Sequence, residues 1–151
     1  MTDPAQSPQD APSLCPACGE PFAGDPSSPE EEGPCPHCRR PVWFVRKPLN
    51  ETVVLTFLTG LVSGSESLGR LDEVTSAVGS ASRIVVDLSR MRFISSMFLG
   101  MLVALHRRVV AAQGALRLCG LRFGEREVFR ATRLDTVFDI REDEASALAS
   151  F

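Results

Sequence analysis

From Glu51 onward, short apolar stretches alternate with longer stretches in which apolar residues recur at helical spacing. The short, β-branched stretches predict three strands, at residues 52–58, 84–88 and 115–119. The spaced patterns predict helices at residues 66–78, 96–112, 125–132 and 142–149. Gly114 follows the helix 96–112 at the position expected for a C-terminal cap. Because strands alternate with helices, the sequence predicts an α/β fold built on a largely parallel sheet.

The helix predicted at 96–112 is unusually apolar and carries two stripes of hydrophobic residues. At about 100° per residue, one stripe should face the sheet. It consists of Phe98, Met101, Leu102, Leu105, Val109 and Ala112. The second stripe, about a third of a turn away, consists of Leu99, Val103 and Val110. This second stripe either packs on a neighbouring helix or forms an exposed patch for a partner.

The first 50 residues have a different composition. Residues 1–13 are polar, acidic and rich in proline, which predicts a disordered tail. Residues 14–46 contain four of the five cysteines but too little apolar bulk to fold unaided. We expect a short junction at 48–50, a main domain over 50–142, and a C-terminal helix or tail at 143–151.

Two Cys-x-x-Cys motifs, with sixteen residues between them, provide the strongest chemical signal. Two such pairs can close a tetrahedral zinc site, each supplying two thiolates. The segment 14–46 therefore resembles a zinc ribbon with a structural Zn²⁺. Its expected ligands are Cys15, Cys18, Cys35 and Cys38. Gly19 suits the tight turn after the first motif, and we expect Trp43 and Phe44 to pack over the metal.

The ribbon leaves three functional readings open. It can be structural or dock a protein, since metal binding supplies its folding energy. It can also contact nucleic acid through a basic and aromatic patch around Arg39, Arg40 and Trp43, or sense redox state. The acidic residues 30–32 and a formal net charge of −3 for the chain favour a protein partner over nucleic acid.

The same sequence argues against export, membrane insertion and catalysis. The N-terminus shows no signal peptide, and the longest apolar run, 97–105, is far too short to span a bilayer. We therefore expect a soluble cytoplasmic protein. We expect no enzyme activity, because Asp72, Asp87 and Asp135 are scattered and no nucleophile, base and oxyanion arrangement converges.

The residues around the start of the helix 96–112 resemble the signature of STAS domains, which join sulphate transporters with anti-sigma-factor antagonists. The signature is carried by Asp87-Leu88-Ser89 and by Phe93-Ile94-Ser95-Ser96-x-x-Leu99-Gly100. The likeness continues through 114–120 to Phe138-Asp139-Ile140, and 58–60 resembles the early strand-end turn. The resemblance covers about residues 50–142 and implies a mixed or mostly parallel sheet of four to five strands with helices.

In the antagonist branch, the resemblance implies that Ser96 is the site phosphorylated by the partner, an anti-sigma factor that is a serine kinase. The unphosphorylated domain binds this kinase, and phosphorylation disrupts the complex. Added phosphate would place about two negative charges at the helix start, which agrees with such a switch. The contacts implied around Ser96 are Ser63, Met97, Phe98, Leu99 and Val103.

This sequence departs from the family pattern near the acceptor. Ser95 replaces the usual Asp, Met97 a second Ser, Phe98 a Gly, and Ser63 an acidic residue. Ser95 is therefore a second candidate for phosphorylation, or the cap of the helix that follows. Two alternatives to a phosphorylated switch remain, a constitutive scaffold that is never phosphorylated and docking through the zinc ribbon.

Overall fold

The computed structural model describes residues 14–16, 18–20, 38, 44–49, 51–57, 74–79, 81–91 and 96–151, except for the side chain of Met97. The strands are β1 (Phe44–Leu49), β2 (Thr52–Phe57), β3 (Arg83–Asp87), β4 (Ala115–Cys119) and β5 (Asp139–Ile140). The helices are α2 (Ser96–Ala111), α3 (Phe123–Ala131), the 3₁₀ turn η3 (Leu134–Thr136) and α4 (Glu144–Ala149). Residues 74–78 are also helical.

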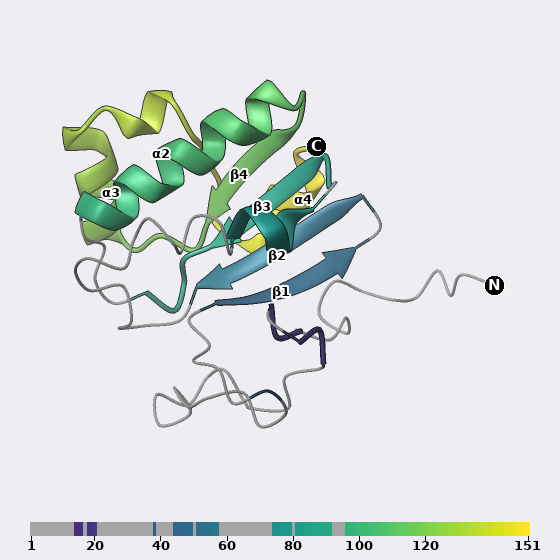
Figure 1. Cartoon of the computed structure of the whole chain (residues 1–151). Helices are drawn as coiled ribbons and strands as arrows, with labels where there is room; N and C mark the ends of the chain where they lie inside the picture. The colour runs from purple at the N-terminus through teal and green to yellow at the C-terminus, as the bar shows by residue number, and fades with distance from the viewer. Residues whose placement is uncertain are drawn as a thin grey trace.

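The strands form one five-stranded mixed sheet of order β1-β2-β3-β4-β5 (Figure 1). β1 runs antiparallel to β2, and the remaining neighbours are parallel. The α/β fold and the largely parallel sheet predicted from the sequence are therefore confirmed. Parallel pairing places the carboxyl ends of β2, β3 and β4 at one edge, which we call the carboxyl edge, and α2 and α3 begin there.

The sequence did not predict β1, and one expectation about its residues is wrong. Pro48 and Leu49, expected in a junction, belong to β1, which also contains Phe44. Phe44 is fully buried and its ring lies 5.5 Å from that of Phe57 in β2. Arg46 and Lys47 interrupt the apolar pattern, and proline is tolerated only because β1 lies at the side of the sheet.

One face of the sheet is covered by helices and carries the main core. Alternation along β2 sends Val53, Leu55 and Phe57 to this face. They pack with buried residues of α2 and α3, and with the helical residues 74–78 (Figure 1). Within the described part of the chain, no helix is long and apolar enough to cross a membrane.

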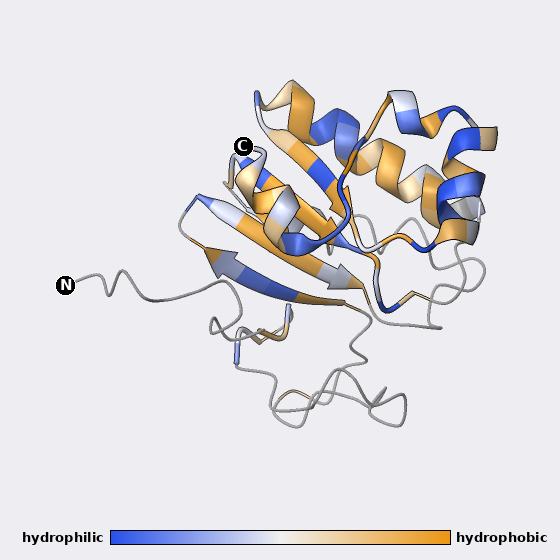
Figure 2. Cartoon of the chain, turned by 180° about the vertical axis from the view of Figure 1, so that it is seen from behind, coloured by the Kyte–Doolittle hydropathy of each residue, from blue (hydrophilic) through white to orange (hydrophobic). Residues whose placement is uncertain are grey.

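The opposite face of the sheet is covered by α4, as Figure 2 shows from behind. Ala147 of α4 packs against Val54, Val85 and Cys119 in a second, smaller core. Asp143 caps the helix by accepting a 2.7 Å hydrogen bond from the Ser146 N–H, and these hydrogen bonds lower the pKa of the Asp143 carboxyl. The sequence predicted this helix two residues too early.

The C-terminus of α2 is closed by a residue other than the expected glycine. Gln113 adopts the left-handed conformation, with φ of 64°, and its N–H donates to the carbonyl of Val110. Gly114 is needed instead for close packing, because a Cβ there would lie 2.8 Å from the carbonyl oxygen of Ser82. Gly114 is therefore required because two chain segments approach closely there, and the left-handed turn belongs to Gln113.

Replacing Gln113 by glycine is therefore expected to stabilise the protein by about 0.5–1 kcal/mol, because glycine removes the left-handed strain at some entropic cost. Urea unfolding monitored by circular dichroism measures this change. Gly114→Ala is the matched control, since it adds one methyl group next door and is expected to destabilise. An equal loss of stability in both variants would contradict the assignment.

Candidate functional site

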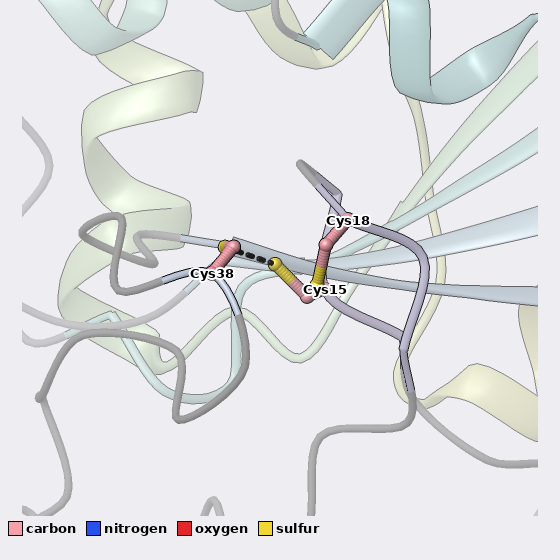
Figure 3. Close-up of side chains that lie close together, drawn as sticks. All are labelled: Cys15, Cys18 and Cys38. Carbon is pink, nitrogen blue, oxygen red and sulfur yellow. Dashed lines mark hydrogen bonds between the residues drawn. The ribbon is translucent and has the colours of Figure 1, made fainter.

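Three of the four predicted metal ligands lie together beside β1. The Sγ atoms of Cys15, Cys18 and Cys38 all lie within 4.8 Å of one another (Figure 3). Cys15 is fully buried, Cys38 is half-buried and Cys18 is exposed. Two segments far apart in sequence thus bring three thiols to one point, and Cys35, the fourth predicted ligand, lies outside the described residues.

The spacing of these sulfurs fits a tetrahedral metal ion. The Sγ atoms of Cys15 and Cys38 are 3.8 Å apart. Four thiolates at about 2.3 Å from a central Zn²⁺ would be separated by about 3.8 Å along each edge of the tetrahedron. The donor set also suits a soft or borderline metal, because thiolates favour zinc over the hard cations. The three described cysteines can hold such a metal.

The local backbone around Cys15 explains how the site is shaped. Gly19 has a φ of 77°, as its sequence position predicted, and its N–H donates to the carbonyl of Cys15 over 2.9 Å. The N–H of Cys15 donates to the carbonyl of Glu20, also over 2.9 Å. These two hydrogen bonds fold residues 15–20 into a closed turn, which we call the Cys turn.

The Cys turn is attached to the sheet through its neighbour Leu14. The backbone groups of Leu14 and Arg46 exchange hydrogen bonds of 2.7 and 3.1 Å, forming an antiparallel bridge next to β1. Figure 1 shows the Cys turn, in purple, beside β1 and on the side of the sheet away from α2. The cysteine cluster is thus joined directly to the first strand of the main domain.

The second candidate site lies at the carboxyl edge, where α2 begins. Ser96 is the first residue of α2 and is exposed. The first turn of α2 contains no acidic residue. A helix start offers unpaired N–H groups and a positive dipole end, so an added phosphate on Ser96 would find favourable charge there. Ser95, Ser63 and the side chain of Met97 lie outside the described residues.

The structure confirms Phe98 on the sheet-facing stripe of α2, and the expectation that Phe98 and Leu99 form an exposed partner surface is wrong. Phe98 is fully buried, and its ring meets that of Phe57 edge to face at 5.2 Å. Leu99 is only 9% exposed, and Val103 is half-buried and packs against the core. Of the second stripe, only Val110 is open to solvent, at 50% exposure. This stripe therefore packs mainly inside the domain.

Two residues that sequence reasoning missed are open at the carboxyl edge. Gly100 is exposed one turn after Ser96, and a Cβ there would meet nothing within 4 Å. Phe123 begins α3 and is 80% exposed, which is unusual for a phenylalanine. The apolar pattern starts this helix two residues later, at 125. Phe123 could have been placed at the carboxyl edge only from its position shortly after the end of β4.

The strand-end turns at the carboxyl edge fit closely together. The Ser89 N–H donates to the Asp87 carboxylate over 2.9 Å, closing the turn after β3. Gly120, with φ of 79°, packs against this turn, and a Cβ there would lie 2.7 Å from both the Asp87 Oδ1 and the Ser89 nitrogen. The Asp-Leu-Ser segment thus holds the turn after β3 against the turn after β4.

Two other reactive side chains have structural surroundings. Cys119 is fully buried, and burial together with the charge of Asp87 raises the pKa of its thiol, as expected for an inert cysteine. The ring of His106 lies 5.2 Å from that of Phe138, edge to face. Partial burial lowers the pKa of His106. His37 lies outside the described residues.

Comparison with known proteins agrees with this architecture. The family model of the STAS domain matches residues 45–147. The protein named "Putative anti-sigma factor antagonist BtrV" from Bordetella bronchiseptica is 28% identical over 100 residues, covering 66% of this chain and 86% of that protein. The family-model match begins within β1 and reaches α4, so it extends beyond the range 50–142 expected from the sequence.

Solved structures show the same fold. An anti-sigma factor antagonist from Mycobacterium paratuberculosis superposes with a TM-score of 0.61 at 18% identity, over 71% of this chain and 91% of that chain. The antagonist SpoIIAA in its unphosphorylated form gives a TM-score of 0.56 at 18% identity, over 71% and 94%. The phosphorylated form of SpoIIAA from Bacillus gives 0.55 at 22% identity, over 71% and 97%.

Proposed function

The chain belongs to the STAS domain family, and on this premise we propose that it is a regulatory protein that binds a serine-kinase anti-sigma factor through the start of α2. The observation that carries the proposal is the exposed Ser96 at the first residue of α2. This serine matches the acceptor position implied by the family motif. The role is regulatory and involves no catalysis by this chain.

Phosphorylation of Ser96 would change the binding surface by charge. A phosphate adds about 1.5–2 negative charges at neutral pH and three acceptor oxygens. The nearby exposed surface offers the small Gly100 and the apolar Phe123. A partner that packs closely on such a surface would have to desolvate the phosphate, so the modified protein should bind more weakly.

The names of the relatives support this proposal. BtrV carries the name of an anti-sigma factor antagonist, and SpoIIAA has been solved both without and with phosphate. At 18% and 22% identity, the likeness to SpoIIAA supports a shared fold. The proposed phosphorylation of Ser96 therefore rests on the position of this serine in the present structure.

Incubation with a serine-kinase anti-sigma factor from the same organism and ATP tests the proposal. We expect mass spectrometry to find phosphate on Ser96 in the wild type, and none there in Ser96→Ala. Ser96→Asp should weaken binding by tenfold or more, whereas Ser96→Ala should bind like the wild type. Ser95→Ala is the control, since it leaves the acceptor intact. Binding without phosphate on Ser96 would favour the constitutive scaffold, and absence of both would contradict the proposal.

Phe123→Ala probes the same surface without disturbing the core. Because the ring is 80% exposed, its loss should leave the fold intact. At the centre of an interface, an aromatic anchor contributes about 2 kcal/mol or more, so binding should weaken at least tenfold. Val110→Ala is the control, since Val110 is also exposed but lies near the opposite end of α2. Isothermal titration calorimetry with the kinase compares the two, and equal affinities would place the interface elsewhere.

We also propose that the four predicted cysteines bind one structural Zn²⁺. Support comes from the 3.8 Å separation of the Cys15 and Cys38 sulfurs and from the position of Cys18 within 4.8 Å of both. Cys35 completes the second Cys-x-x-Cys motif. Elemental analysis of the purified full chain should give about one zinc per chain, as a single tetrahedral site requires. A metal-free chain that cannot be loaded with zinc would contradict this site.

A further inference from the structure

We infer that occupancy of the cysteine site controls the stability of the start of α2, through β1 and the contacting rings of Phe44, Phe57 and Phe98. This inference rests on the proposed zinc site and assigns it a regulatory effect on the face around Ser96. The two sites lie on different parts of the sheet, since the Cys turn adjoins β1 while α2 packs over the sheet (Figure 1). A continuous path of contacts joins them.

The first step of the path is the attachment of the Cys turn to β1. Leu14 pairs with Arg46 through two backbone hydrogen bonds, and the next residue, Cys15, is a fully buried member of the cysteine cluster. A metal bound to Cys15 and Cys38 holds together two segments whose own apolar content is too small to fold. Metal loss therefore releases Leu14 from β1.

The second step runs through the rings. Phe44 begins β1, two residues before Arg46, and its ring centroid lies 5.5 Å from that of Phe57. Phe57 in turn meets Phe98 edge to face, with centroids 5.2 Å apart and planes at 82°. All three rings are fully buried. A shift or fraying of β1 therefore changes the packing against Phe98, and Phe98 lies two residues after Ser96.

β1 is the strand of the sheet best suited to carry such an effect. On one side it pairs with β2, and on the other the described residues give it only the bridge from Leu14. It is also tied to α4 by the ion pair between Lys47 and Glu144, and Leu49 packs against the second core. Edge strands with few tertiary ties open locally at a lower free energy than central strands such as β3. Removing the bridge should lower that free energy further.

Hydrogen exchange of the full chain, compared with and without zinc, tests the inference. After removal of zinc with a chelator, we expect amide exchange to accelerate by about tenfold or more in β1 and in residues 98–101. Exchange in β3 and β4 should stay within about twofold, because these central strands keep their neighbours. Acceleration in β1 alone, with 98–101 unchanged, would overturn the coupling while leaving the zinc site standing.

A second variant keeps the metal and interrupts the path. Phe44→Leu retains an apolar side chain at this core position but removes the ring that meets Phe57. It should bind zinc in the same amount as the wild type, while the effect of the chelator on residues 98–101 becomes several times smaller. An undiminished effect would overturn the role of the ring contacts, and a wild type that binds no zinc would contradict both this inference and the proposed site.

Discussion

Replacing Cys15 by serine is expected to lower zinc affinity at least 100-fold and to detach the Cys turn from β1. Structural zinc sites supply about 10–16 kcal/mol of binding free energy, and a hydroxyl is a poor substitute for a thiolate ligand. Cys15 is fully buried at the point where the turn joins the sheet, so its loss acts on the metal and on the attachment together. Competition with a chromogenic chelator measures the affinity.

Cys119→Ala is the matched control for this experiment. Cys119 is also fully buried, but it packs with Val54, Val85 and Ala147 on the α4 side of the sheet. Its raised pKa keeps it protonated, so it does not compete for the metal. The control should keep full zinc affinity. If Cys15→Ser bound zinc as tightly as the control, the cysteine cluster would not be the metal site.

Replacing Phe98 by alanine is expected to cost about 3–5 kcal/mol of folding free energy, the range for removing a large ring from a packed core. The expectation follows from its complete burial and its edge contact with Phe57. Urea unfolding of the full chain measures the loss. If Phe98 were a surface contact for a partner, the same substitution would change stability by less than about 0.5 kcal/mol.

Phe123→Ala is the comparison, because it removes the same side chain from an exposed position at the start of α3. We expect its stability to stay within about 0.5 kcal/mol of the wild type. The two variants also show which positions are suitable for testing the proposed partner surface around Ser96. A charge introduced at Leu99, which is 9% exposed, would unfold the protein as readily as it would weaken binding, so exposed positions should be used.

The local patterns of the sequence were sufficient for the central part of the fold. β4 occupies the predicted residues 115–119, and α2 begins at the predicted Ser96. Both are strongly apolar elements whose period is visible without neighbours. β1 escaped prediction because Arg46, Lys47 and Pro48 disrupt its pattern, and β5, with two residues, is too short to show one. Their strand character comes from pairing with a neighbour.

Some residues of the candidate sites could likewise be predicted from local sequence patterns, and others depend on tertiary packing. The cysteine cluster was expected from the spacing of the two Cys-x-x-Cys motifs, and three of the four predicted cysteines lie together in the structure. Which side chains of α2 reach the surface depends on how other elements cover the helix. An apolar helix with two stripes cannot show this, so the sequence left open whether the stripe with Leu99 packs inside the domain, as it does, or faces a partner. To predict the exposed Phe123, one would have to know where β4 ends as well as the apolar pattern of the helix.

The bridge between Leu14 and Arg46 also bears on whether copies of the chain associate through the sheet. An open strand at the side of a sheet presents backbone groups that can pair with another chain. At one side the sheet ends in β5, which is only two residues long, while β1 offers six residues. The Cys turn occupies part of this longer side. By holding the Cys turn in place, a bound metal would prevent β1 from pairing with a strand of another molecule. Metal-depleted preparations should therefore associate more than metal-loaded ones.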